Sequence, residues 1–208
     1  MSIKDNLLQI KSQLPESVTL VAVSKTKPVS DLMEAYNAGQ RIFGENKIQE
    51  MTEKWEQMPK DIQWHMIGHV QTNKVKYMAE YVSLIHGVDS LKLLQEINKQ
   101  AAKHNRIIDC LLQMYIAEEE TKFGLDEKEL EDILHFVQND KLQNIKVVGL
   151  MGMATFTDNQ TQIKKEFLNL KSTFDKINSL SIVNYQLSII SMGMSGDYNL
   201  AIECGSTM

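Results

Sequence analysis

Short apolar runs rich in β-branched residues recur along this chain, and segments with helical periodicity separate most of them. Strands joined by helices make right-handed crossovers and therefore a parallel sheet. Eight such strands close into a (β/α)8 TIM barrel, which is the α/β fold that we predict. An open doubly wound sheet would show the same alternation, but no glycine fingerprint of the dinucleotide-binding type follows the first strand. The predicted strands cover residues 18–24, 41–44, 62–68, 82–87, 107–116, 145–155, 185–191 and 201–204.

The helical segments carry recognisable start and stop signals. Ser30 is predicted to cap a helix that stops at Gly39, and Asp126 to cap a helix with an acidic first turn. The predicted helices cover residues 30–38, 90–104, 126–137 and 161–180, and an additional N-terminal helix over residues 2–14 precedes the first strand. Only three prolines occur and no low-complexity linker interrupts the pattern, so we expect a single domain over residues 1–208.

Charge and cysteine content restrict the partners and the compartment. The net charge is −5, and acidic and basic residues are mixed along the chain, so electrostatics gives no reason to expect nucleic acid or an anionic membrane as a partner. No apolar run approaches the roughly 20 residues of a membrane-spanning helix, and the N-terminus does not resemble a signal peptide. Cys110 and Cys204 lie far apart in apolar runs, which is typical of a reducing compartment. We expect a cytoplasmic monomer.

A lysine stands where the mouth of the predicted barrel should be. Reactive groups of such barrels lie in the loops after the C-terminal ends of the strands, and Lys25 directly follows the first strand. A lysine there is partly desolvated, and its amine is a nucleophile towards an aldehyde. The alternative is that Lys25 and Lys27 are solvated lysines in a loop before a helix, and position alone does not separate the two interpretations.

The second and third strands also end in polar residues. Asn46 should face the same mouth and could hydrogen-bond a polar substituent of a ring, although it could equally cap the helix that starts at Lys47. His65 and His69 are four residues apart. On a strand this spacing places them on one face but about 13 Å apart, which is too far for one shared metal ion without a bend.

Two small-residue loops near the end of the chain are predicted to bind phosphate. The sequence SMGMSGD at 191–197 follows the seventh predicted strand, and Gly205, Ser206 and Thr207 follow the eighth. Barrels often bind phosphate with backbone N–H groups in these two loops, whereas the alternative for either loop alone is ordinary turn chemistry. A mouth lysine and a phosphate nest together indicate a phosphorylated aldehyde, bound either by a Schiff-base aldolase or by a protein that holds pyridoxal 5'-phosphate (PLP).

The sequence resembles the pyridoxal phosphate homeostasis proteins, single-domain barrels related to the N-terminal domain of alanine racemase. The resemblance rests on AVSKTKP at 22–28, FGEN at 43–46, HMIGHVQTNK at 65–74, SMGMSGD at 191–197 and GSTM at 205–208. It implies that Lys25 forms the Schiff base with PLP and that Asn46 lies near the cofactor ring. The residues that it implies for the phosphate are Ser191, Gly205, Ser206 and Thr207.

The resemblance also implies a role in intracellular PLP homeostasis, with PLP-dependent apo-enzymes as possible recipients. It implies a further Val-Arg-Ile-Gly segment beyond Met208, whose arginine meets the pyridine nitrogen. Racemases need a base on each face of the substrate, and the second base comes from an additional domain. We therefore expect a PLP-binding protein without efficient turnover. A racemase of low activity and a Schiff-base aldolase are the alternatives.

Overall fold

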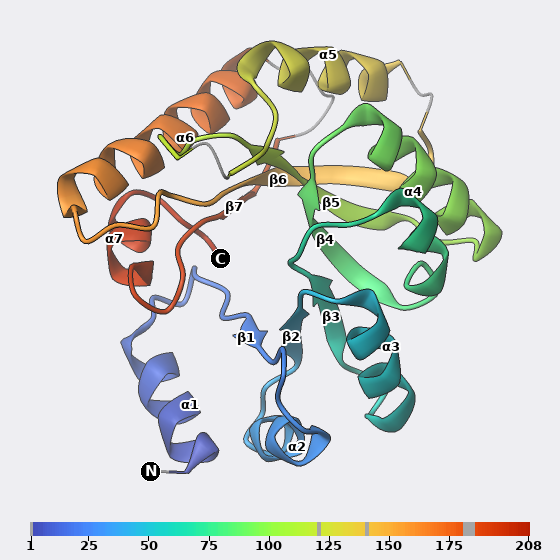
Figure 1. The fold of residues 1–208 in the computed structure, drawn as a ribbon, viewed down its shortest axis with the longest axis vertical. Coiled ribbons are helices and arrows are strands. Elements are labelled where there is room, and N and C mark those ends of the chain that lie inside the picture. Colours follow the sequence, from blue (N-terminus) through green and yellow to red (C-terminus); the bar gives the residue numbers. More distant parts are fainter. Residues whose placement is uncertain (1, 120–121, 140–141, 181–185) are drawn as a thin grey trace.

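Seven parallel strands, hydrogen-bonded in sequence order, form one strongly curled sheet, and the helices lie along its outer side (Figure 1). This computed structural model describes residues 2–119, 122–139, 142–180 and 186–208. The strands are β1 (Ala22–Val23), β2 (Ile42–Glu45), β3 (Gln63–Met66), β4 (Val82–Val88), β5 (Ile108–Met114), β6 (Ile145–Gly152) and β7 (Ile189–Ser191). Every strand pair is parallel, so the predicted TIM-barrel-like fold is confirmed, with seven strands assigned in place of eight.

The helices follow the strands in the expected alternation. They are α1 (Ile3–Gln13), α2 (Val29–Asn37), α3 (Ile48–Gln57), α4 (Leu91–Lys103), α5 (Glu127–Gln138), α6 (Gln160–Leu180) and α7 (Tyr198–Glu203), together with a 3-10 helix η1 (Thr72–Tyr77). The predicted extra N-terminal helix is α1, which begins with a capping box between Ser2 and Asp5. No helix among the described residues is long and apolar enough to cross a membrane.

Capping explains where most of the predicted helices begin. The Ser90 side chain accepts from the Leu93 N–H at the start of α4, and Asp126 forms a capping box with Glu129 at the start of α5. The prediction that Ser30 caps α2 is wrong, because the helix already begins at Val29 and Pro28 occupies the cap position. Proline presets the backbone at a helix start, so it competes with a nearby serine for this place.

The core has two parts. The larger cluster lies between the sheet and the surrounding helices and contains fully buried side chains such as Trp64, Leu94 and Phe167. The smaller cluster comprises Leu84, Leu111, Val148 and Met151, which come from β4, β5 and β6. These three strands are buried almost throughout, as expected for parallel strands that are covered on both faces.

The eighth predicted strand is the main correction to the fold. Residues 201–203 form the end of α7 instead and Cys204 is its C-cap, because an apolar run this short does not distinguish helix from strand. The chain after α7 nevertheless reaches the place of an eighth strand. The Thr207 N–H donates to the carbonyl of Ile190 at 2.9 Å, and the Thr207 carbonyl accepts from the Thr19 N–H at 2.9 Å. Thr207 thus links β7 to the segment that leads into β1.

The other strand predictions agree with the structure in place but not in length. The predicted strand 18–24 shortens to the two residues of β1, and the prediction for 185–191 becomes β7, which begins at Ile189. Tyr185 lies outside the described residues. Longer and fully buried strands such as β5 are recovered nearly whole, because their burial on both faces makes the apolar run continuous.

Gly149 in β6 lies at a close approach to β7. A Cβ atom there would lie 1.9 Å from the carbonyl oxygen of Ile189 in β7, and backbone of a sheet cannot yield cheaply. Gly149→Ala is therefore expected to destabilise the protein by about 1–3 kcal/mol or more, as overpacking does, measured by urea unfolding. Gly196→Ala is the matched control, because nothing lies within 4 Å of a Cβ there. An equal stability of the two variants would contradict this account of the β6–β7 contact.

Candidate functional site

A cavity of about 440 Å³ is lined by residues from the ends of several strands and from the loop after β7. Its polar lining includes Lys25 after β1, His86 of β4, Ser191 at the end of β7 and Ser206 after α7. The volume lies within the range of ordinary small-molecule sites. Of the predicted site residues, Lys25, Ser191 and Ser206 line this cavity, whereas Asn46, Gly205 and Thr207 are not among its lining residues.

Lys25 stands on a loop with an unusual backbone. Thr26 has φ +64, in the left-handed region that a β-branched residue rarely adopts. Such a conformation costs about 1–3 kcal/mol and persists only where the surroundings enforce it. The Lys25 side chain itself is exposed and makes no ion pair with any described residue, so the predicted partial desolvation is not observed.

Charged side chains from β2 and α3 bind the backbone on either side of Lys25. The Lys54 ammonium donates to the Ser24 carbonyl, to Glu45 Oε1 and to Glu50 Oε1, each at 2.7 Å. Ser24 Oγ also donates to Glu45 Oε1 at 2.6 Å, and the Thr26 N–H donates to Glu50 Oε1 at 2.6 Å. We call these three side chains, Lys54, Glu45 and Glu50, the lysine-loop network. The side chains of Lys54 and Glu45 are 6% and 0% exposed.

The two carboxylates of the network differ in their surroundings. Burial raises the pKa of Glu45, against the opposing hydrogen bonds from Lys54 and Ser24, and its Oε2 has no hydrogen-bond partner among the described residues. Glu50 is less buried, so although desolvation opposes ionisation, the hydrogen bonds from Lys54 and the Thr26 N–H lower its pKa. The two carboxylates that Lys54 joins are therefore shifted in opposite directions, and the more buried one is Glu45.

Asn46 follows β2 and packs against the next strand end. A Cβ built on Gly68 would lie 2.5 Å from the Asn46 carbonyl oxygen, so the absence of a side chain at Gly68 allows this approach. The alternative interpretation of Asn46 as a helix cap is wrong, because Lys47 occupies the cap position of α3. None of the hydrogen bonds among the described residues involves the Asn46 side chain.

A chain of hydrogen bonds crosses the interior of the sheet to Ser191. His65 Nδ1 lies 3.0 Å from His86 Nε2, and His86 Nδ1 lies 3.1 Å from Ser191 Oγ. Burial lowers the pKa of His65 to about 4, and burial together with the nearby His65 lowers the pKa of His86 to about 3. Both imidazoles are therefore neutral at physiological pH, and they orient Ser191 without adding a positive charge.

The two histidines singled out in the sequence are separated by the fold. His65 is buried against His86, whereas His69 is exposed and its Nδ1 lies 3.3 Å from Asp89 Oδ2. His69 also contacts the ring of Phe123 edge-on. Within the described parts of the chain, no group of three or more metal-binding side chains converges.

The loop after β7 offers free backbone donors. Gly193 has φ +93, which turns the chain sharply, and the Met194 N–H is already bound by the Asp197 carboxylate. The N–H groups of Gly193 and Ser195 donate to no acceptor among the described residues, and both residues line the cavity. Together with Ser191 they form a set of neutral donors of the kind that binds a phosphate.

The second predicted phosphate loop follows α7 and reaches the position of an eighth strand at Thr207. Gly205 ends α7 with φ +100, and a Cβ there would lie 2.8 Å from the Lys171 side chain of α6. Thr207 Oγ1 accepts from the Ile190 N–H at 3.0 Å. Ser206 Oγ lies 2.9 Å from the Met192 carbonyl. Gly205 therefore lies against α6 and Thr207 against β7, and Ser206 alone of the three reaches the cavity.

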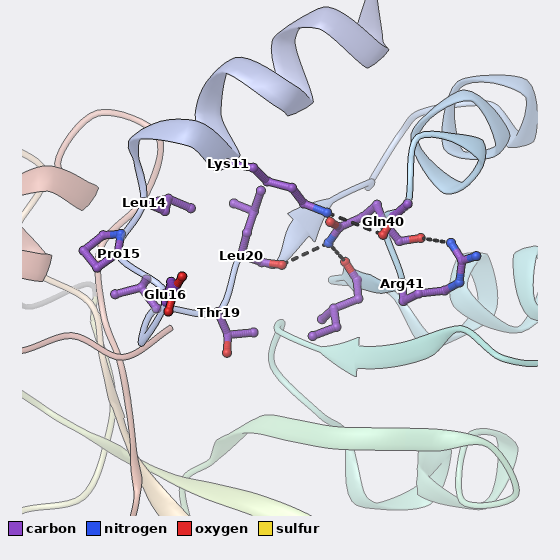
Figure 2. Close-up of a pocket in the computed structure, with 11 residues that line it drawn as sticks. Lys11, Leu14, Pro15, Glu16, Thr19, Leu20, Gln40 and Arg41 are labelled. Atoms are coloured by element: carbon purple, nitrogen blue, oxygen red, sulfur yellow. Dashed lines mark hydrogen bonds between the residues drawn. The ribbon is translucent and has the colours of Figure 1, made fainter.

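A second cavity lies between α1 and the segments that precede β1 and β2 (Figure 2). Polar side chains in its lining donate hydrogen bonds to backbone carbonyls of neighbouring segments. Lys11 Nζ donates to the Gly39 carbonyl at 3.4 Å, and Gln40 Nε2 donates to the carbonyls of Leu20 and Ile42 at 3.0 and 2.7 Å. These contacts join α1 to the sheet and give this cavity a structural role.

Comparison with known proteins fits this geometry. The profile of the family described as alanine racemase, N-terminal domain, matches residues 1–208. The pyridoxal phosphate homeostasis protein of Aquifex aeolicus is 38% identical over 190 residues, which are 91% of this chain and 82% of the relative. This chain belongs to the pyridoxal phosphate homeostasis protein family. The family resemblance read from the five sequence motifs is thereby confirmed.

Solved structures agree with the family assignment. PipY of Synechococcus elongatus, solved without PLP, superposes with a TM-score of 0.92 at 33% identity, over 99% of this chain and 95% of that one. PipY with PLP bound gives a TM-score of 0.88 at 32% identity, with the same coverage. An alanine racemase from Clostridium difficile gives 0.79 at 16% identity over 98% of this chain and 52% of its own, which shows the shared fold alone.

Sequence reasoning missed several residues of this family member's site. His86 lies near the C-terminal end of β4, the place where barrel chemistry is expected, and this position could have drawn attention to it. Glu45 precedes the predicted Asn46 directly, but Lys54 and Glu50 gave no signal, because charged residues on a helix usually face solvent. Only the fold shows that α3 turns these two side chains towards the loop of Lys25.

Proposed function

We propose that this chain binds PLP as a Schiff base on Lys25 and serves intracellular PLP homeostasis. The observation that carries the proposal is that Lys25, Ser191 and the N–H groups of Gly193 and Ser195, which have no acceptor among the described residues, line one cavity. An amine and a set of phosphate donors in one cavity match a phosphorylated aldehyde. The naming of the relatives and the PLP-bound structure of PipY support PLP over a sugar phosphate.

The residues of this chain divide the work of binding. The phosphate would meet Ser191 Oγ and the N–H groups after β7, and the Asn46 amide is free to bond a ring substituent. Among the residues of the second predicted loop, Ser206 remains a proposed phosphate contact, whereas Gly205 would act by ending α7 against α6 and Thr207 by supporting β7. When bound, PLP supplies an aldehyde carbon and an electron-withdrawing ring. Lys25 supplies the amine, and its exposure allows PLP to enter and leave.

The proposal is tested by trapping. Purified protein mixed with PLP should develop a visible absorption band, and borohydride should bleach the band and leave a pyridoxyl group on one peptide. Mass spectrometry is expected to place this group on Lys25. Recovery of the adduct only on other lysines, in proportion to their exposure, would defeat the proposal. A colourless protein whose lysine is trapped only with a sugar phosphate would favour the aldolase alternative.

We further propose that the chain does not turn over amino acids efficiently. A racemase needs a base on each face of its substrate. The titratable side chains among the described lining residues are Lys25, His86 and Tyr198. His86 is buried, neutral and hydrogen-bonded at both ring nitrogens, so it is poorly placed to move protons. Rapid loss of optical activity from L-alanine with PLP-loaded protein would support the racemase alternative, with Tyr198 as the first candidate for the second base.

The remaining parts of the proposal concern surroundings and partners. A cytoplasmic location is supported by Cys110 and Cys204, which are both free and buried. PLP-dependent apo-enzymes are the proposed recipients of PLP, and a monomer is the proposed state. Sedimentation of the purified protein tests the second point, and transfer of PLP to an added apo-enzyme faster than PLP dissociates into buffer tests the first.

A further inference from the structure

Both neighbours of Lys25 in the chain are bound to the lysine-loop network. The Ser24 carbonyl accepts from Lys54, and the Thr26 N–H donates to Glu50. Lys54 uses all three of its N–H bonds within this network, on two carboxylates and one carbonyl. Side chains from β2 and α3 therefore hold the backbone on both sides of Lys25. The Lys25 side chain itself lines the cavity.

The network is expected to contribute little to the free energy of unfolding. Burying an ion pair costs desolvation that its mutual attraction only partly returns, and apolar replacements of similar shape are often at least as stable. It also enforces a strained backbone, since Thr26 with φ +64 would relax in a free loop. A costly network that imposes a costly conformation is typical of a functional site, where the position of a reacting group must be fixed.

We propose that Glu45, Lys54 and Glu50 are positioning residues, which fix the loop so that the Lys25 amine meets the aldehyde of a ligand whose phosphate is held after β7. The proposal rests on the proposed function. It assigns to these residues no contact with the ligand, because their side chains bind the backbone and Ser24. Their loss should therefore reduce reaction at Lys25 more than it reduces binding of the ligand.

The test uses Glu50→Ala, which removes the acceptor of the Thr26 N–H and leaves the Glu45–Lys54 pair. Glu53→Ala is the matched control, because Glu53 is exposed on the same helix and carries the same charge. On mixing with PLP, the visible band of Glu50→Ala should form at least about tenfold more slowly, since small misplacements of a reacting group cost up to about a hundredfold. Affinity for pyridoxine 5'-phosphate, which lacks the aldehyde, should stay within about twofold.

A second variant and a second readout keep the test decisive. Glu50→Gln retains an oxygen that accepts from the Thr26 N–H and should restore most of the rate. Hydrogen exchange at the Thr26 amide should be faster in Glu50→Ala than in Glu53→Ala. Equal rates in Glu50→Ala and Glu53→Ala, or a parallel loss of affinity for pyridoxine 5'-phosphate, would overturn the proposal. If the unmodified protein forms no band, the proposed function fails, and exchange at Thr26 alone decides whether the network fixes this backbone.

Discussion

Replacing Lys25 with alanine is expected to abolish completely the pyridoxyl adduct that borohydride reduction leaves on the protein. The substitution removes the amine that the proposed Schiff base requires, and no other lysine in the described parts of the chain lines the same cavity. Stability should change by no more than about 0.5 kcal/mol, because the Lys25 side chain is exposed and pairs with no described residue. The adduct is measured by mass spectrometry and the stability by urea unfolding.

Lys27→Ala is the control for this prediction, because Lys27 lies in the same loop, is also exposed and does not line the cavity. It should retain the band and the adduct. A further check uses pyridoxine 5'-phosphate, whose binding does not need the amine and should survive in Lys25→Ala. If the variant still yields a full adduct on another single lysine, the site has been assigned to the wrong strand end.

Acidification is expected to destabilise the protein strongly through His65 and His86. Their folded-state pKa values of about 4 and about 3 lie below the ordinary value of 6.5. Below pH 6.5 the two imidazoles therefore bind protons in the unfolded chain before they do so in the folded chain. Stability should therefore fall as the pH drops from about 6.5 towards 3. Between pH 7 and pH 5, the loss that comes from the two histidines should be on the order of 3 kcal/mol.

Urea unfolding at pH 7 and pH 5 measures this loss, and histidine variants assign it. His86→Gln should remove about half of the difference between the two pH values, whatever its effect at pH 7. His104→Gln is the control, because it removes an exposed imidazole that lies outside the buried pair. A pH dependence that is unchanged in His86→Gln would mean that the buried pair is not its source.

The parts of the fold that the sequence predicts well are those where burial leaves a strong pattern. The predictions for β4 to β6, and for the capped helices α4 and α5, agree within a few residues. The eighth strand failed because residues 201–204 are too few to show a period, and apolar side chains suit a short helix equally well. The chain does reach the place of that strand, but only with Thr207, beyond the predicted segment.

The candidate site was predictable where one strand end determines one residue. Lys25 and Ser191 follow from the barrel rule directly, and both line the cavity. Gly205 and Thr207 were predicted from the misplaced eighth strand and from the family resemblance; they do not line the cavity, and their part in phosphate binding stays a prediction. The lysine-loop network depends on contacts between residues about 20 to 30 positions apart, and no local pattern in the sequence records such contacts.

The path from His65 through His86 to Ser191 has a further consequence, which concerns where its protons sit. A neutral His86 carries one proton, so it either donates to Ser191 and accepts from His65, or accepts from Ser191 and donates to His65. Only the first arrangement leaves the serine hydroxyl hydrogen free for an acceptor-only phosphate dianion. A phosphate bound to the loop after β7 would thus select one tautomer of His65 on β3. Nitrogen NMR of His65 would therefore detect a ligand that His65 does not contact.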